Sequence, residues 1–235
     1  MATERRKRTQ SGQEIVEFGL VAILLIPMFL GTFVVGMNLI RSIQANQVVR
    51  DLTDMYIHGA DFSTYSMQQE AQRLAQGLNV QIGSSFSGNR QANTSNSGNG
   101  LITVTQIMYI GSTTSPNCVA VGAANCTNHD NFVYTQQIQF GNGTLANSGT
   151  VSLGTPSGAT INSAGIVANY VTDSHAKLGS AAEAAMQSMW QTTNNGQQAL
   201  ADGQVVYIVE GYFQSPDLSL VGSVSGNGVY ARYFF

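Results

Sequence analysis

Residues 18–40 read FGLVAILLIPMFLGTFVVGMNLI and contain no charged side chain. As an α-helix this segment would extend about 34 Å, slightly more than the roughly 30 Å hydrocarbon core of a bilayer. It therefore predicts a single transmembrane helix. Pro27 lies inside the segment and predicts a kink there, because proline removes one helical hydrogen bond.

A cleaved secretory signal is the competing interpretation of this segment, since a basic cluster at residues 5–8 precedes it. Signal sequences have a shorter apolar core and a small-x-small cleavage site, and no such site follows Ile40. The span is therefore expected to stay in the mature protein. The basic cluster outweighs Arg41 and Arg50 behind the span, which predicts a cytoplasmic N-terminus and an extracytoplasmic body.

Charged residues make up only 10% of the 235-residue chain, well below the ~25% of ordinary globular domains. Low charge together with 25 glycines is typical of a chain that works outside the cytoplasm. Without residues 1–12 the chain would keep six basic and twelve acidic residues, a formal net charge of −6. Such a body has no broad basic surface, which argues against nucleic-acid binding.

Residues 5–21, immediately before and into the span, read RRKRTQSGQEIVEFGLV. Gly12 is followed by Gln13 and, at the fifth position after the glycine, by Glu17 next to Phe18. This arrangement resembles the processing site of type IV prepilins: a basic leader, a glycine before the cut, and glutamate as the fifth mature residue. The Glu-Phe pair before a long apolar helix is most similar to the Tad (tight adherence) pilus family, in particular its TadE-like and TadF-like pseudopilins.

The resemblance implies cleavage by a prepilin peptidase between Gly12 and Gln13. A carboxylate at the edge of the hydrocarbon is costly unless it is paired or protonated. In pilins this glutamate is thought to pair with the N-terminal amine of a neighbouring subunit, so Glu17, beside Phe18, is expected to meet Gln13 of another copy during assembly. Gln13 replaces the phenylalanine of major pilins, so N-methylation does not follow from the resemblance. The body is far larger than that of major Tad pilins, which favours a minor pseudopilin.

The implied partners are other pilin subunits, the prepilin peptidase, an inner-membrane assembly platform and membrane lipid. The implied location is the bacterial inner membrane and, after assembly, a cell-surface pilus. A single-span anchored binding protein or adhesin is the alternative; it would keep residues 1–12 and tolerate Glu17→Ala. An anchored hydrolase is the third hypothesis, but His58, His129 and His175 are scattered and match no catalytic motif. No enzyme activity, cofactor or metal is therefore expected.

The body is expected to be an α+β domain. Helical periodicity continues past the span and predicts one helix from about Glu14 to Ile57, ending near Gly59. A short second helix is expected from Ser63 or Ser66 to Gly77, with Ser63 as its cap. A further helix is expected around Ser180 to Trp190. Residues rich in β-branched and aromatic side chains predict an antiparallel sheet, with strands at 101–110, 131–140, 204–213 and 228–235.

The predicted domains are a leader at 1–12, a transmembrane and stalk helix at 13–58, and an extracytoplasmic domain at 59–235. Residues 83–100 are expected to be a loop too polar to bury. Cys118 and Cys126 are expected to form a disulfide if the body is exported, and two free thiols are the alternative.

Overall fold

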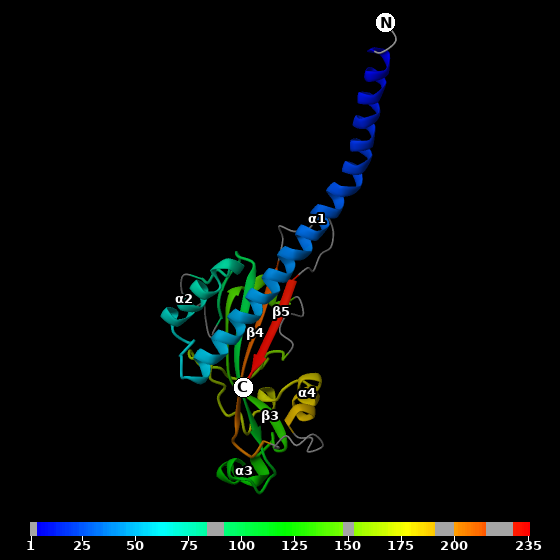
Figure 1. The fold of residues 1–235 in the computed structure, drawn as a ribbon. Helices are drawn as coiled ribbons and strands as arrows, with labels where there is room; N and C mark the ends of the chain where they lie inside the picture. The colour runs from blue at the N-terminus through cyan, green and yellow to red at the C-terminus, as the bar shows by residue number, and fades with distance from the viewer. Residues whose placement is uncertain (1–3, 84–91, 148–152, 191–199, 215–227) are drawn as a thin grey trace. The chain divides into compact units, whose positions relative to one another are not determined.

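The computed structural model describes residues 4–83, 92–147, 153–190, 200–214 and 228–235 (Figure 1). The chain divides into two compact units, residues 1–41 and 42–235, and each unit is described by itself. Helix α1 (Glu4–Ile57) contributes residues to both units. In the first unit the described residues all belong to this helix, which begins ten residues earlier than the sequence predicted. The Glu, Arg, Lys and Gln residues that precede Gly12 are good helix formers, so they continue the helix toward the N-terminus.

Helix α1 ends at Ile57, as predicted, and its end lies in the second unit. Gly59 adopts a φ of 89°, which only glycine reaches without strain. The N–H of Gly59 donates to the carbonyl of Tyr56 at 3.1 Å and the N–H of Ala60 donates to that of Met55 at 2.9 Å. This pair of bonds is a Schellman motif, and it satisfies carbonyls that the helix end would otherwise leave without a donor.

The second unit contains a five-stranded sheet in the order β1-β3-β2-β4-β5. Strand β2 pairs antiparallel with β3 and β4, and β4 pairs antiparallel with β5. The α+β prediction is therefore confirmed, with a sheet that is mixed and mostly antiparallel. The strands are β1 (Ala92–Ser95), β2 (Gly100–Ile110), β3 (Asn131–Asn142), β4 (Val205–Gln214) and β5 (Gly228–Phe234).

Strand β1 corrects the prediction of a loop at residues 83–100, of which residues 84–91 lie outside the described part. It pairs in parallel with β3, from Ala92 opposite Gln139 to Ser95 opposite Asn142. Asparagine and, more weakly, alanine are depleted in strands. Pairing with a partner far away in the sequence overrides that preference here.

One face of the sheet packs against residues 42–57 of α1. The buried helix residues recur every three or four positions: Ala45, Val48, Val49, Leu52 and Tyr56. They share a core with residues of β2, β3 and β4: Ile102, Val104, Ile138, Phe140, Val209 and Phe213. This core joins the C-terminal part of α1 to the sheet within one unit.

Helix α2 (Tyr65–Leu74) extends the same core through Ala71. The residue at its N-cap position is Thr64, and its side chain makes no capping bond, so the predicted Ser63 cap is wrong. The N–H of Ser63 instead donates to the carboxylate of Asp61 at 2.9 Å. The chain thus turns into α2 through a hydrogen bond made by the aspartate.

A second hydrophobic cluster surrounds the other end of β2, β3 and β4. It includes α4 (Ser180–Trp190), which the sequence predicted, and the short helix α3 (Pro116–Val121), which it did not. A disulfide joins Cys118, in α3, to Cys126, and both cysteines are buried. The remaining short elements are the 3₁₀ turns η1 (Gln76–Leu78), η2 (Ala123–Asn125), η3 (Gly143–Asn147) and η4 (Ser174–Ala176).

Candidate functional site

The predicted processing site, Gly12 and Gln13, lies within the helical backbone of α1. Gly12 is exposed, and a Cβ at this position would meet no atom within 4 Å. Packing inside the chain therefore gives no reason for a glycine here. Glycine is about 1 kcal/mol less favourable than alanine inside a helix, so this position is a weak point of α1.

Glu17 and Phe18 follow Gln13 along the same helix. Because Glu17 comes four residues after Gln13, the two residues lie on one side of α1, one turn apart. The side chain of Phe18 is 75% exposed, and Glu14 and Glu17 are exposed as well. Within one copy, α1 therefore presents its predicted assembly residues outward.

The apolar residues of the first unit are exposed along most of the helix. Ile15, Phe18 and Ile23 are each more than 70% exposed, and they are members of a longer apolar series. Exposed apolar surface of this extent favours a bilayer or other apolar helices over water. Among the described residues, the helix at 14–57 is the one that is long and apolar enough to cross a membrane, judged by length and composition.

Pro27 lies inside α1, and the helix continues through it. Because proline has no N–H, the carbonyl of Ile23 loses its usual helical donor. One turn further on, the hydroxyl of Thr32 donates to the carbonyl of Phe29 at 2.9 Å. The kink at Pro27 stays a prediction.

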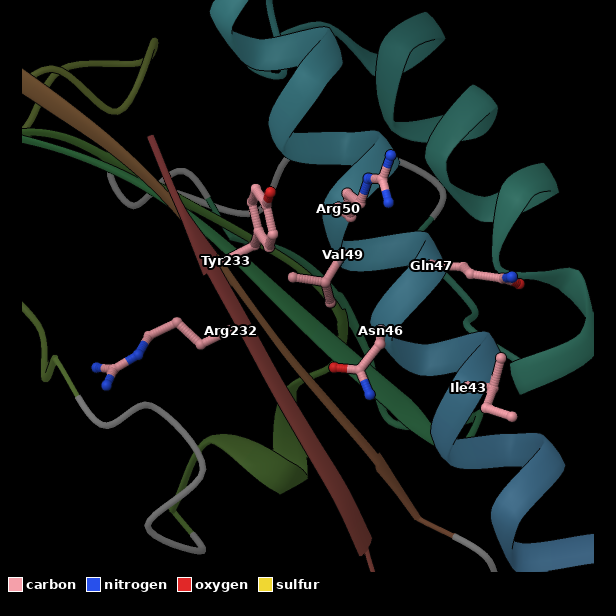
Figure 2. Close-up of a pocket in the computed structure, with 7 residues that line it drawn as sticks. All are labelled: Ile43, Asn46, Gln47, Val49, Arg50, Arg232 and Tyr233. Atoms are coloured by element: carbon pink, nitrogen blue, oxygen red, sulfur yellow. The ribbon is translucent and has the colours of Figure 1, made fainter.

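A groove of about 300 Å³ runs between α1 and β5 in the second unit, and the sequence analysis missed it. Figure 2 shows that Asn46 and Val49 of α1 point toward β5 and that Tyr233 of β5 points toward α1. Arg50 lies at the rim, whereas the side chain of Arg232 leads away from α1 (Figure 2). No local pattern could have revealed this groove, because helix and strand lie at opposite ends of the chain.

The carboxylate of Asp202 organises the loop that holds the disulfide. It accepts the N–H of Gly111 at 2.7 Å, and both the N–H and the side-chain amide of Asn117 at 3.0 Å. Partial burial acts to raise the pKa of Asp202, but these hydrogen bonds outweigh it and hold the pKa below its usual value. Both oxygens of Asp202 therefore accept hydrogen bonds from groups of the same chain, which indicates a structural role.

The next question is whether ionisable side chains come together as a metal site among the residues that the structure describes. No group of three or more His, Cys, Asp or Glu residues comes together there in a geometry that could hold a metal ion. His129 and His175 each lie beside a neighbouring aspartate, at 3.1 Å from Asp130 and 3.0 Å from Asp173. Each pair joins residues only one or two positions apart in the sequence.

In the described residues, a long helix with exposed apolar side chains precedes an α+β body. Residues 12–53 match the protein-family model described as TadE-like protein, so this segment is a TadE-like domain. The match begins at Gly12 and covers the span and most of the α1 residues that pack on the sheet. A TadE-like segment suggests an association with the Tad pilus machinery. Neither the curated proteins nor the solved structures yield a significant match to the chain.

Proposed function

We propose that this chain is a minor pseudopilin of a Tad or type IV-like pilus, made as a precursor and cleaved between Gly12 and Gln13. The observation that carries the proposal is the TadE-like match, which begins at Gly12 and runs through an apolar helix with exposed side chains. The glycine supports cleavage at this point, because it weakens the helix locally and leaves the backbone uncovered. The peptidase would then unwind only a short stretch of α1.

Before assembly the N-terminus faces the cytoplasm and the body lies outside the inner membrane; after assembly the chain is part of a cell-surface pilus. The new amine of Gln13 in one copy pairs with the carboxylate of Glu17 in another. Each charge is costly at the edge of the hydrocarbon, so the pair relieves that cost only when the subunits are in register. The partners are therefore other pilin subunits and the inner-membrane assembly platform, within membrane lipid.

Sequencing of the N-terminus of the chain isolated from cells tests the cleavage. We expect Gln13 as the first residue, and we expect loss of the prepilin peptidase to leave the leader in place. An uncut chain would support an anchored binding protein or adhesin. A chain cut after Ile40 would mean that the span is a secretory signal, and either result overturns the proposal.

The role of Glu17 is tested with a matched control on the same helix. Glu17→Ala is expected to abolish incorporation into the pilus while the chain is still produced and cleaved. Glu14→Ala removes another exposed carboxylate three residues away and is expected to leave incorporation intact. Equal incorporation of the two variants would show that Glu17 only marks the membrane boundary.

A further inference from the structure

The disulfide between Cys118 and Cys126 lies beneath the surface of the loop that joins β2 to β3. Cys118 is 0% exposed and Cys126 is 3% exposed. The Sγ atom of Cys118 lies 3.7 Å from the carbonyl oxygen of Gly111. Val119, the residue after Cys118, is 62% exposed, so the loop itself borders solvent. A thiol in solution therefore reaches the loop but not its sulfur atoms.

The short helix α3, which carries Cys118, has no cap from its own N-cap residue. It is six residues long, and a helix of that length is unstable in isolation. Ser115 at its N-cap position makes no side-chain capping hydrogen bond. The carboxylate of Asp202, 85 residues further along the chain, accepts the N–H of Asn117 in the first turn instead. The start of α3 is therefore held by a residue from a distant part of the sequence.

The same carboxylate holds the two ends of this loop together. One oxygen of Asp202 accepts the N–H of Gly111 at 2.7 Å, and the carbonyl of Gly111 accepts the N–H of Asp130 at 3.1 Å. A Cβ on Gly111 would lie only 3.0 Å from the Cβ of Asp202, so the two residues pack closely. The N–H of Gly203 also donates to the carbonyl of Tyr109 at 2.9 Å. The segment before β4 thus fixes both α3 and the start of the loop that contains the disulfide.

We propose that Asp202 is a latch that shields the disulfide, so that a thiol reduces the Cys118–Cys126 bond only after the contact between Asp202 and α3 has opened. The same restriction applies to formation of the bond. A disulfide oxidant takes two electrons and two protons from the two cysteine thiols, and it must reach them before Asp202 closes on α3. Once formed and covered, the bond persists in surroundings that contain thiols. This inference goes beyond the proposed function and does not depend on it.

Reduction by dithiothreitol supplies the measurement. Its thiolate attacks one sulfur of the bond and expels the other as a cysteine thiolate; its second thiol then attacks the mixed disulfide, and dithiothreitol leaves as a cyclic disulfide. Cys118 and Cys126 become two thiols and have gained two electrons and two protons. Because the chain contains two cysteines, labelling with iodoacetamide and mass spectrometry count the reduced molecules directly.

The rate of this reduction in the full-length chain, in a neutral detergent, tests the latch. We expect Asp202→Ala to raise the rate by about ten- to a hundredfold, because hydrogen bonds to a charged group are lost and the loop opens more often. The raised rate should depend only weakly on urea, because a local opening exposes little surface. Asp202→Asn keeps the shape and one acceptor oxygen; a smaller increase is expected, and this variant still tests the latch if Asp202→Ala does not fold.

Asp61→Ala is the matched control. The carboxylate of Asp61 also accepts a backbone N–H, that of Ser63 at 2.9 Å, but it lies before α2, beside the hydrophobic cluster that does not contain the cysteines. We expect this variant to be reduced at the wild-type rate.

Three results would overturn the latch. They are a wild-type rate in the Asp202 variants, equal acceleration in Asp61→Ala, and a rate that rises with urea as steeply as global unfolding does. None of them bears on cleavage before Gln13 or on the need for Glu17, so the proposed function is decided separately.

Discussion

The carboxylate of Glu183 lies beneath the first residues of β3, where it is 6% exposed. Both of its oxygens accept the N–H of Phe132 at 3.2 Å, and one accepts the amide of Gln187 at 3.0 Å. Burial raises the pKa of Glu183, although these hydrogen bonds and Lys177 oppose the rise. The folded chain therefore holds this proton more tightly than the unfolded chain does. The stabilisation is complete below the unfolded-state pKa and is lost as the pH rises through the folded-state pKa.

Glu183→Gln keeps an acceptor for Phe132 and removes the titration. We expect this variant to lose less free energy of unfolding than the wild type between pH 4 and pH 7. Glu183→Leu leaves the Phe132 N–H without its acceptor and is expected to cost about 1 to 3 kcal/mol at pH 7. Denaturation of the full chain in detergent, followed by the fluorescence of its single tryptophan, Trp190, measures both. An equal loss from Gln and Leu at pH 7 would contradict this role.

The packing of α1 on β4 depends on a close approach at Gly211. A Cβ on Gly211 would lie 2.7 Å from Cγ2 of Val49 and from the ring of Phe213. Gly211→Ala is therefore expected to push the helix from the sheet and to lower the free energy of unfolding by about 1 to 3 kcal/mol. At Gly77 the same change meets only the side chain of Gln44 at 3.8 Å, so Gly77→Ala serves as the control. Similar unfolding midpoints for the two variants would show that α1 and β4 adapt freely.

Elements with strong local patterns were predicted closely from the sequence. The apolar run predicted the helical course of α1, and Gly59 predicted its end. Segments rich in β-branched and aromatic residues predicted the bounds of β2, β3, β4 and β5 to within a few residues. Strand β1 and helix α3 were missed for two different reasons. The former has a polar composition and a distant partner, and the latter is six residues long between turn-forming segments.

Of the candidate sites, one could be predicted from the sequence and the other could not. Gly12, Gln13 and Glu17 are close in sequence, so a linear motif could point to them. The groove needs Arg50 and Tyr233 side by side, which only the pairing of β5 with β4 and the packing of α1 provide. Tertiary packing of this kind leaves no short-range signal in a single sequence.

At the scale of the whole molecule, the two parts of α1 differ in the burial of their apolar side chains. Its residues before 42 expose apolar side chains, whereas its residues from 42 onward complete the core of the second unit.

Truncation on either side of this division gives the final prediction. A chain of residues 42–235 keeps Ala45, Val48, Val49, Leu52 and Tyr56, and is expected to be soluble and to unfold cooperatively. A chain of residues 59–235 lacks them, and losing about 1.5 to 3 kcal/mol for each large buried side chain would consume most of a typical 5 to 15 kcal/mol of stability. We expect it to aggregate or to unfold without a cooperative transition, as monitored by Trp190 fluorescence and size-exclusion chromatography. If both chains unfold at the same urea concentration, the helix contributes no essential part of the core, and the stalk is only a tether.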